Sequence, residues 1–224
     1  MLAKNEVPAC RSNDALWLWV PEFAGTTPLG WLQRFDRGCG GLPLRLILSY
    51  THLQVPLPIM TVRPIVRYPD PRLAIPARPV TAFDDTLREL ANDLLETMHA
   101  APGIGITAPH IGVFLRLVVL DLGDKDGAIT YVNPEIEWAS SETILHREGS
   151  VSMPGVNDEV TRHARVRISY QDVDGVLLSE ESDGLRAVCH QHEIDQLNGM
   201  FWIHRLSRLK RERLIKRFEK MSRS

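Results

Sequence analysis

Residues 192–196 read His-Glu-Ile-Asp-Gln and differ at one position from the zinc-hydrolase signature H-E-x-x-H. Positions i and i+4 of a helix lie one above the other. The two histidines of that signature can therefore bind one metal ion while the glutamate reaches the metal-bound water. In this chain His192 and Glu193 are present, but Gln196 replaces the second histidine. The segment predicts a hydrolase-like helix with an incomplete set of metal ligands.

Two further segments carry residues of the same chemical kind. Residues 103–110 read Gly-Ile-Gly-Ile-Thr-Ala-Pro-His, and residues 148–152 read Glu-Gly-Ser-Val-Ser. In their order and spacing the three segments resemble the three motifs of peptide deformylases, which remove the formyl group from the N-terminal formyl-methionine of new proteins. The resemblance extends from about Val62 to Leu214 and includes residues 68–71 and Arg147.

The resemblance implies an open metal site. In active members a cysteine thiolate and two histidines hold Fe(II) or Zn(II), and the fourth position is left for water, whose pKa the metal lowers. The glutamate moves the proton, while a glutamine of the first motif and the backbone N–H after the cysteine bind the developing oxyanion. Carried over, these roles fall on Glu193 as acid and base, on His192 as one ligand, and on the N–H of Val151 as a donor.

Three positions depart from the family pattern: His110 stands for the glutamine, Ser150 for the cysteine and Gln196 for the second histidine. A serine hydroxyl stays protonated and binds metal weakly, whereas a thiolate forms readily beside a metal. A glutamine carbonyl is a hard, neutral ligand that suits calcium better than iron or zinc. We therefore expect a weak or absent metal site.

Other side chains could complete a different site. His110 could join His192 and Gln196, since it occupies the position from which the family's glutamine approaches the metal. His190 precedes His192 by two positions and so points to nearly the opposite side of the helix. Cys189 shares the face of His192 more closely, but its helix position is typical of a buried structural thiol. The remaining histidines lack ligand spacing and are expected at the surface or in hydrogen bonds: His99, His146, His163 and His204.

The expected substrate-contacting residues each have a simpler alternative. Gly103, Ile104 and Gly105 would let the backbone approach a bound peptide closely, but the glycines could equally form a turn after the preceding helix. Glu148 and Arg147 complete the set by resemblance. An ordinary ion pair between Glu148 and a nearby arginine explains that glutamate at least as well.

Periodicity predicts the elements that must position these residues. Apolar residues at three- and four-residue steps predict a helix over 84–99, ended by Pro-Gly at 102–103. Short β-like runs follow at 115–120 and 129–132, and a hairpin is predicted from 166–170 and 176–178. The signature helix should run from about Gly184 to Leu197. Periodicity indicates only mixed α and β, and the resemblance implies an α+β domain whose mostly antiparallel strands surround the signature helix.

Bulk composition narrows the class of protein. The chain has 224 residues, 44% of them hydrophobic and 24% charged, with a net charge of −2, which is typical of a soluble globular protein and does not favour DNA or an anionic membrane as partner. The best apolar stretch, 42–59, is broken by polar residues and prolines, so no membrane span is expected. Three scattered cysteines indicate no disulfide framework, and a cytoplasmic location is expected.

The two ends of the chain differ from the middle. Residues 1–59 show no sustained period and are expected to be a poorly structured extension, either because the translation start is placed too far upstream or because they form a targeting or docking arm. Residues 60–224 are expected to form the deformylase-like domain.

A last helix is predicted over 206–218. The segment 205–220 holds eight Lys and Arg residues against two glutamates. Its leucines could dock on the domain, or its basic face could contact ribosomal RNA, as the family's C-terminal helix can.

Three interpretations remain open from the sequence. The chain could keep the fold and have lost most of the hydrolysis. It could be a working metallohydrolase with an altered ligand set. It could also be a non-catalytic module that binds peptide N-termini, such as a formyl-Met nascent chain, in the groove, or binds ribosomes through the basic helix.

Overall fold

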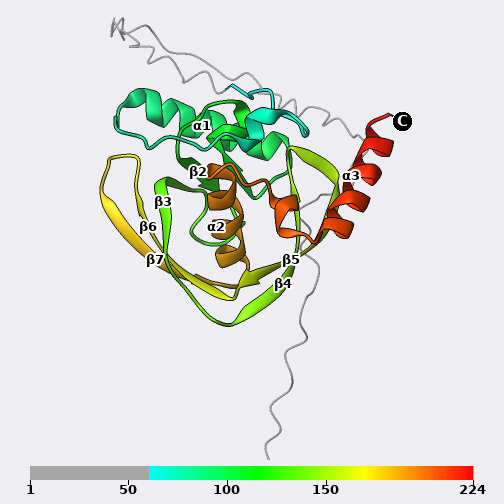
Figure 1. Ribbon diagram of the computed structural model, residues 1–224. Helices are drawn as coiled ribbons and strands as arrows, with labels where there is room; N and C mark the ends of the chain where they lie inside the picture. Colours follow the sequence, from blue (N-terminus) through cyan, green and yellow to red (C-terminus); the bar gives the residue numbers. More distant parts are fainter. Residues whose placement is uncertain (1–60, 224) are drawn as a thin grey trace, which may run out of the picture. The chain divides into compact units, whose positions relative to one another are not determined.

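The computed structural model describes residues 61–223 (Figure 1). The expected extension, residues 1–59, lies outside the described residues. The helices are α1 (Asp85–Ala100), α2 (Gly184–Leu197) and α3 (Arg208–Ser222), and the 3-10 turns are η1 (Pro71–Ala74), η2 (Ala108–Ile111) and η3 (Trp202–Arg205). The strands are β1 (Gly105–Thr107), β2 (Leu117–Leu120), β3 (Ile129–Ala139), β4 (Thr143–Ser150), β5 (Met153–His163), β6 (Arg165–Gln171) and β7 (Leu177–Asp183).

The strands form two antiparallel sheets. A five-stranded sheet has the order β1-β2-β3-β6-β7, and β4 pairs only with β5 in a separate ribbon. Figure 1 shows α2 between the curved larger sheet and this ribbon, with α1 across one end and α3 beside β5. The fold expected from the resemblance, antiparallel sheets around the signature helix in an α+β domain, is confirmed.

Helix α2 is the centre of the packing. Ten of its fourteen residues are buried, among them the polar residues Gln191, Glu193, Asp195 and Gln196. A helix buried on nearly every side packs against other elements all round. One core cluster joins residues of β2, β3 and β6 to four residues of α2: Ala187, Cys189, Ile194 and Leu197. Because the helix is enclosed, the side chains of the signature cannot move freely.

Helix α1 begins and ends with local hydrogen bonds. The side chain of Asp84 accepts from the backbone N–H of Leu87 at the N-terminus. At the other end the N–H of Gly103 donates to the carbonyl of Met98. The helix packs its apolar face into a cluster with β1 and β2. The predicted helix, the hairpin β6–β7 and the extent of α2 are confirmed.

The ribbon β4–β5 is the element that periodicity missed. Its two strands span residues 143–150 and 153–163. Polar residues occupy inward positions of both strands, because buried Glu148 and Arg162 satisfy each other there instead of apolar side chains. No alternation of apolar and polar residues therefore marks these strands.

Helix α3 docks by one apolar stripe. Leu214 is buried, and the partly buried Ile215 and Phe218 pack against the same cluster, which includes Val156 of β5. Leu209, one of the leucines of the predicted helix that could dock on the domain, is 66% exposed and does not dock. Within the stretch 61–223, no helix has the length and apolar character that crossing a bilayer requires.

Candidate functional site

A cavity of about 30 Å³ lies where the three motifs meet. It is lined by Gly103, Ile104, Gly105, His110, Glu148, Gly149, Ser150, Val151, Val188, Cys189, His192 and Glu193. The structure thus brings together nearly all of the sequence-predicted site residues, from β1, η2, the end of β4 and α2. The exceptions are Arg147, which is exposed on β4, and Gln196, which is buried elsewhere.

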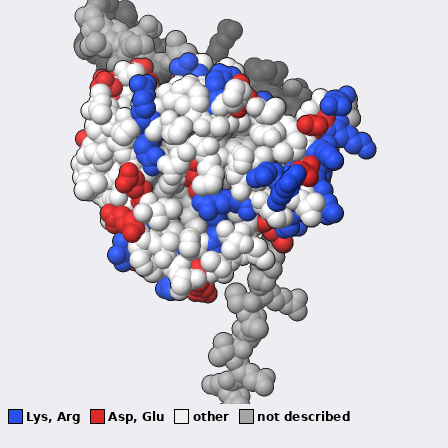
Figure 2. All heavy atoms as spheres, viewed as in Figure 1, with Lys and Arg blue, Asp and Glu red and all other residues white. Residues whose placement is uncertain are grey.

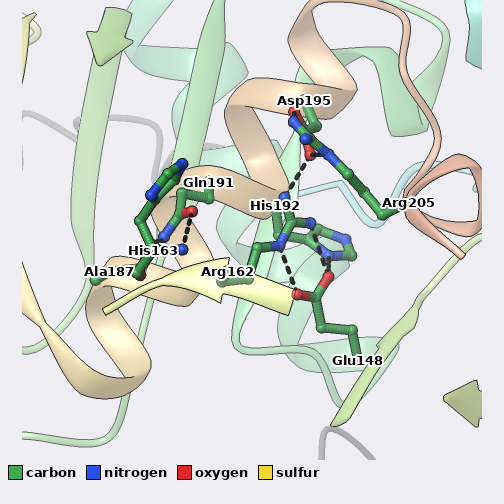
Figure 3. A network of polar contacts seen from close by, with 8 residues as sticks. All are labelled: Glu148, Arg162, His163, Ala187, Gln191, His192, Asp195 and Arg205. Carbon is green, nitrogen blue, oxygen red and sulfur yellow. Dashed lines mark hydrogen bonds and ion pairs between the residues drawn. The ribbon is translucent and has the colours of Figure 1, made fainter. Parts of the chain in front are cut away.

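A network of ion pairs lies behind the cavity (Figure 3). Arg162 donates from Nε to Oε1 of Glu148 at 2.7 Å and from Nη2 to Oε2 at 2.9 Å. Its Nη1 donates to Asp195, which also accepts two hydrogen bonds from Arg205 at 2.6 and 2.9 Å. Such bidentate arginine–carboxylate pairs fix side chains in place. The ion-pair alternative for Glu148 is therefore what the structure shows.

His192 is held by the same network. Its Nδ1 lies 2.8 Å from Oε2 of Glu148, and the ring lines the cavity. Burial by itself would lower the pKa of His192, but the hydrogen bond to Glu148 and the negative charge of that residue outweigh it and raise the pKa. Burial alone would raise the pKa of Glu148, but Arg162 and His192 lower it to about 2.

Ser150 and Gln196, at the other two ligand positions, form hydrogen bonds within the fold. Oγ of Ser150 accepts a hydrogen bond from the backbone N–H of Ser152 at 3.1 Å. Nε2 of Gln196 donates to the carbonyl of Leu73 in η1 at 2.8 Å, so this amide group faces away from the cavity. Among residues 61–223, no three His, Cys, Asp or Glu side chains are grouped closely enough to hold a metal ion. The side chains present do not fit the family's metal.

His110 is buried and oriented by a local cap. Thr107 is the N-cap of η2, and its backbone N–H donates to Nδ1 of His110 at 3.0 Å. A nitrogen that accepts a hydrogen bond carries no proton, so in the neutral ring Nε2 carries it. That Nε2 is buried and has no partner. Burial, followed by the charge of His192, lowers the pKa of His110 to about 3, so the ring is neutral.

Glu193 lines the cavity and lies against β1. A Cβ at Gly105 would come within 2.5 Å of Oε1 of Glu193, so only glycine fits there while the carboxyl keeps its place. The other oxygen, Oε2, is buried without a partner. Burial raises the pKa of Glu193 to about 7, a value suited to a group that accepts and returns a proton near neutral pH.

The alternative ligands considered from the sequence lie elsewhere or are buried. The ring of His190 packs edge-on against Tyr131, with Nε2 3.4 Å from Oε1 of Glu180, on a different side of α2 from His192. Cys189 belongs to the core as predicted, but it also lines the cavity, which the sequence did not indicate. Burial raises the pKa of its thiol, so it is protonated.

Sequence reasoning missed two positioning residues. Arg162 stands on β5, 14 positions from Glu148 and 33 from Asp195, and no spacing rule links such distant residues. Thr107 could have been found, because a threonine followed three positions later by a polar side chain is the pattern of a capping box.

Known proteins match most of the described chain. The family model for polypeptide deformylase matches residues 62–212. A peptide deformylase-like protein of Bradyrhizobium diazoefficiens is 81% identical over 164 residues, which cover 73% of this chain and 96% of that protein. A peptide deformylase of Methylocella silvestris is 49% identical, covering 72% and 85%. A crystal structure of a peptide deformylase from Legionella pneumophila has a TM-score of 0.69 at 41% identity, covering 73% and 96%.

Proposed function

The chain belongs to the polypeptide deformylase family, and from this premise we propose that it keeps the family's fold and peptide site but has lost most of the metal-dependent hydrolysis. The observation that carries the proposal is the hydrogen bond from the amide of Gln196 to the carbonyl of Leu73. The family's third metal ligand stands at this position, but the side chain of Gln196 is instead hydrogen-bonded to η1. Losing even a residue that only supports a ligand typically costs about 10–100-fold in metal affinity or activity.

The proposed ligand is the N-terminus of a formyl-Met peptide or nascent chain, taken up in the cytoplasm. The cavity is bordered by Gly103 and Gly105, and among residues 61–223 β1 pairs on one side only, with β2. The backbone groups on its other side can add a peptide strand, which is a common mode of peptide binding. Val151 would offer its backbone N–H, while Glu148 would hold His192 in place at the cavity.

The direct test measures metal and turnover in the same sample. Full-length protein is purified without oxygen, its Fe, Ni and Zn content is determined, and hydrolysis of formyl-Met-Ala-Ser is followed with each metal added as Fe(II), Ni(II) or Zn(II). We expect far less than one metal per chain and no turnover above a blank. Stoichiometric metal with turnover that disappears in Glu193→Ala would instead establish a hydrolase with an altered ligand set.

Reversion tests whether the scaffold still supports the chemistry. The double variant Ser150→Cys, Gln196→His restores the family's ligands and should gain metal and some hydrolysis, with His110 limiting the rate. The same double variant with Glu193→Ala is the control, since it should bind metal without turnover. If the double variant folds but gains no metal, loss of the ligands is not the reason for inactivity.

The basic helix supports a second proposal, contact with ribosomal RNA. Lys and Arg side chains gather over α3 in Figure 2, and all but one of the eight in the segment 205–220 are exposed. Changing Arg208, Arg211 and Arg213 to glutamine should reduce co-sedimentation with ribosomes at low salt, because phosphate contacts dominate such binding. The control triple variant changes Arg78, Arg165 and Arg167, which are exposed on other elements. Equal co-sedimentation of both variants would reject this contact.

A further inference from the structure

The turn that joins β4 to β5 carries one of the lost ligand positions. In active members of the family, a metal bound by the cysteine of this turn connects the turn to the signature helix. In this chain Oγ of Ser150 instead accepts the N–H of Ser152 at 3.1 Å, and this bond stays inside the turn. The connection that holds the turn beside the cavity therefore has to come from another segment.

Residues 66–68, near the start of the described chain, provide a connection of this kind. The backbone N–H of Tyr68 donates to the carbonyl of Ser152 at 2.9 Å. The backbone N–H of Val66 donates to the carbonyl of His110 in η2 at 2.7 Å. Since η2 and the turn both contribute residues to the cavity lining, this segment joins two sides of the cavity.

The same segment is fixed in the core. Val66 is buried in a cluster with Phe201 and Trp202. The ring of Tyr68 stacks on that of Phe201, with the ring centroids 5.5 Å apart. The residues before and after Arg67 are thus held by packing and by backbone hydrogen bonds, so the side chain of Arg67 extends from a fixed backbone.

Arg67 bonds to the peptide unit at the centre of the turn. Its Nη1 donates to the carbonyl of Val151 at 2.6 Å. The N–H of the same peptide unit belongs to Ser152 and donates to Oγ of Ser150. Both polar ends of this peptide unit are therefore occupied. The bond from the guanidinium group is charge-assisted, which makes it stronger than a bond between neutral groups.

The position of Val151 determines one wall of the cavity. Val151 lines the cavity, and its Cγ1 would lie 3.0 Å from a Cβ built on Gly103, so the turn contacts the segment that leads into β1. A shift of the turn would break this contact. It would also displace the backbone N–H of Val151, which the proposed function assigns to the peptide.

We infer that Arg67 is a positioning residue that replaces the metal as the connection holding the β4–β5 turn, and with it Val151, at the cavity. The inference rests on the proposed function and adds the residue that keeps the site in shape after the ligands are lost. The simpler alternative is an exposed arginine whose bond to a carbonyl water could replace without effect. The two interpretations differ in what happens to the turn when Arg67 is changed.

The test measures amide hydrogen exchange by NMR on the full-length protein in EDTA. Arg67→Met keeps an unbranched side chain and removes the donors. The N–H of Ser152 should then exchange about tenfold faster, the factor that one hydrogen bond to a charged group implies, because the turn opens more often. Amides in the middle of α1 and α2 should keep their rates. Unchanged exchange at Ser152, or equal acceleration at all three places, would overturn the inference.

Two further variants separate positioning from the loss of a charge. Arg67→Lys keeps a cationic donor and should restore part of the protection of the Ser152 amide. Arg72→Met is the matched control, because Arg72 is also an exposed arginine but pairs with Asp70, two positions away. Acceleration at Ser152 in Arg72→Met as large as in Arg67→Met would contradict the assignment.

A contact across the cavity gives a second, independent measurement. In the unaltered protein the methyl protons of Val151 and the α-protons of Gly103 should show a nuclear Overhauser effect, since these residues are in contact. The effect should weaken in Arg67→Met and stay unchanged in Arg72→Met. A full-strength effect in Arg67→Met would show that Val151 keeps its place without Arg67.

Restoring the ligands tests whether Arg67 stands in for the metal. In the double variant Ser150→Cys, Gln196→His loaded with Zn(II), the metal connects the turn to α2 again, so adding Arg67→Met should accelerate exchange at residue 152 by less than about twofold. An acceleration as large as in the metal-free protein would overturn the replacement. If the double variant takes up no metal, exchange at Ser152 in the metal-free protein decides alone. Metal and turnover in the unaltered protein would refute the proposed function, whereas unchanged exchange in Arg67→Met refutes only this inference.

Discussion

Buried polar groups on the two sides of the signature helix differ in whether they have hydrogen-bond partners. Behind the cavity, Arg162 joins Glu148 and Asp195, and every charged group has a partner. In the cavity itself, His110 and Glu193 each keep a buried atom unpaired. A satisfied network stabilises one arrangement of side chains, whereas unpaired groups cost stability and are kept where a ligand can use them. The comparison separates what holds this site in shape from what the site can bind.

Two glutamates of the same cavity show the contrast most directly. The pKa of Glu148 is lowered to about 2 because its hydrogen bonds to Arg162 and His192 outweigh burial. The pKa of Glu193 is raised to about 7 because burial is not offset by a hydrogen bond to its Oε2. The same chemical group is therefore a permanent anion on one side of the cavity and a titrating acid on the other.

The largest effect should come from breaking the network. Arg162→Met leaves the carboxylates of Glu148 and Asp195 buried without their shared cation. Removing one partner of a buried ion pair costs about 3–5 kcal/mol, so urea unfolding should show a loss of that size. Arg167→Met, which removes an exposed ion pair with Glu181, should cost at most about 1 kcal/mol. Similar losses of unfolding free energy in the two variants would mean that the buried network stabilises the fold no more than an exposed ion pair.

The next effect is a pH dependence from the cavity side. Burial raises the pKa of Glu193 from 4.5 to about 7 in the folded protein. The protonated carboxyl therefore contributes stability that is fully present below about pH 4.5 and is lost as pH rises to 7. Between pH 5 and pH 8 the free energy of unfolding should therefore fall by roughly 2–3 kcal/mol less in Glu193→Gln than in the unaltered protein. Glu148 has the opposite sign, since its contribution is present above about pH 4.5 and is lost as pH falls towards 2. Identical pH profiles for Glu193→Gln and the unaltered protein would falsify the assignment.

A smaller effect should follow at the former ligand position on α2. Gln196→Met keeps the length of the side chain but leaves the carbonyl of Leu73 without its donor. An unsatisfied buried acceptor costs about 1–3 kcal/mol in free energy of unfolding. Unchanged stability would mean that the bond from α2 to η1 contributes nothing, and the structural reason for a glutamine here would disappear.

The smallest effect is expected at Ser150. Ser150→Ala removes the acceptor for the N–H of Ser152 and should cost about 0.5–1.5 kcal/mol, since the position is only partly buried. Ser141→Ala, at an exposed serine before β4, is the control and should change stability by less than about 0.5 kcal/mol. A loss as large as that of Arg162→Met would place Ser150 in the network, against the hydrogen bonds that the structure shows.

Local sequence patterns sufficed for the helices and one hairpin. The apolar steps of α1 and the extent of α2 depend on residues a few positions apart, and both were predicted correctly. The exposed Leu209 shows the limit of the same reasoning, because periodicity identifies apolar positions on a helix but not which of them contact the rest of the domain. The ribbon β4–β5 was missed because charged Glu148 and Arg162 stand among its inward residues.

The sequence by itself determined which chemical groups are available: His192 and Glu193 on one helix, His110 after a glycine-rich strand, and Ser150 and Gln196 in place of ligands. Tertiary structure alone decided which of them are used. Gln196 bonds to Leu73, 123 positions away, and Arg162 reaches Glu148 and Asp195 from another strand. The physical reason is that residue type sets what a side chain can donate or accept, whereas its partner depends on strand register and packing between distant segments.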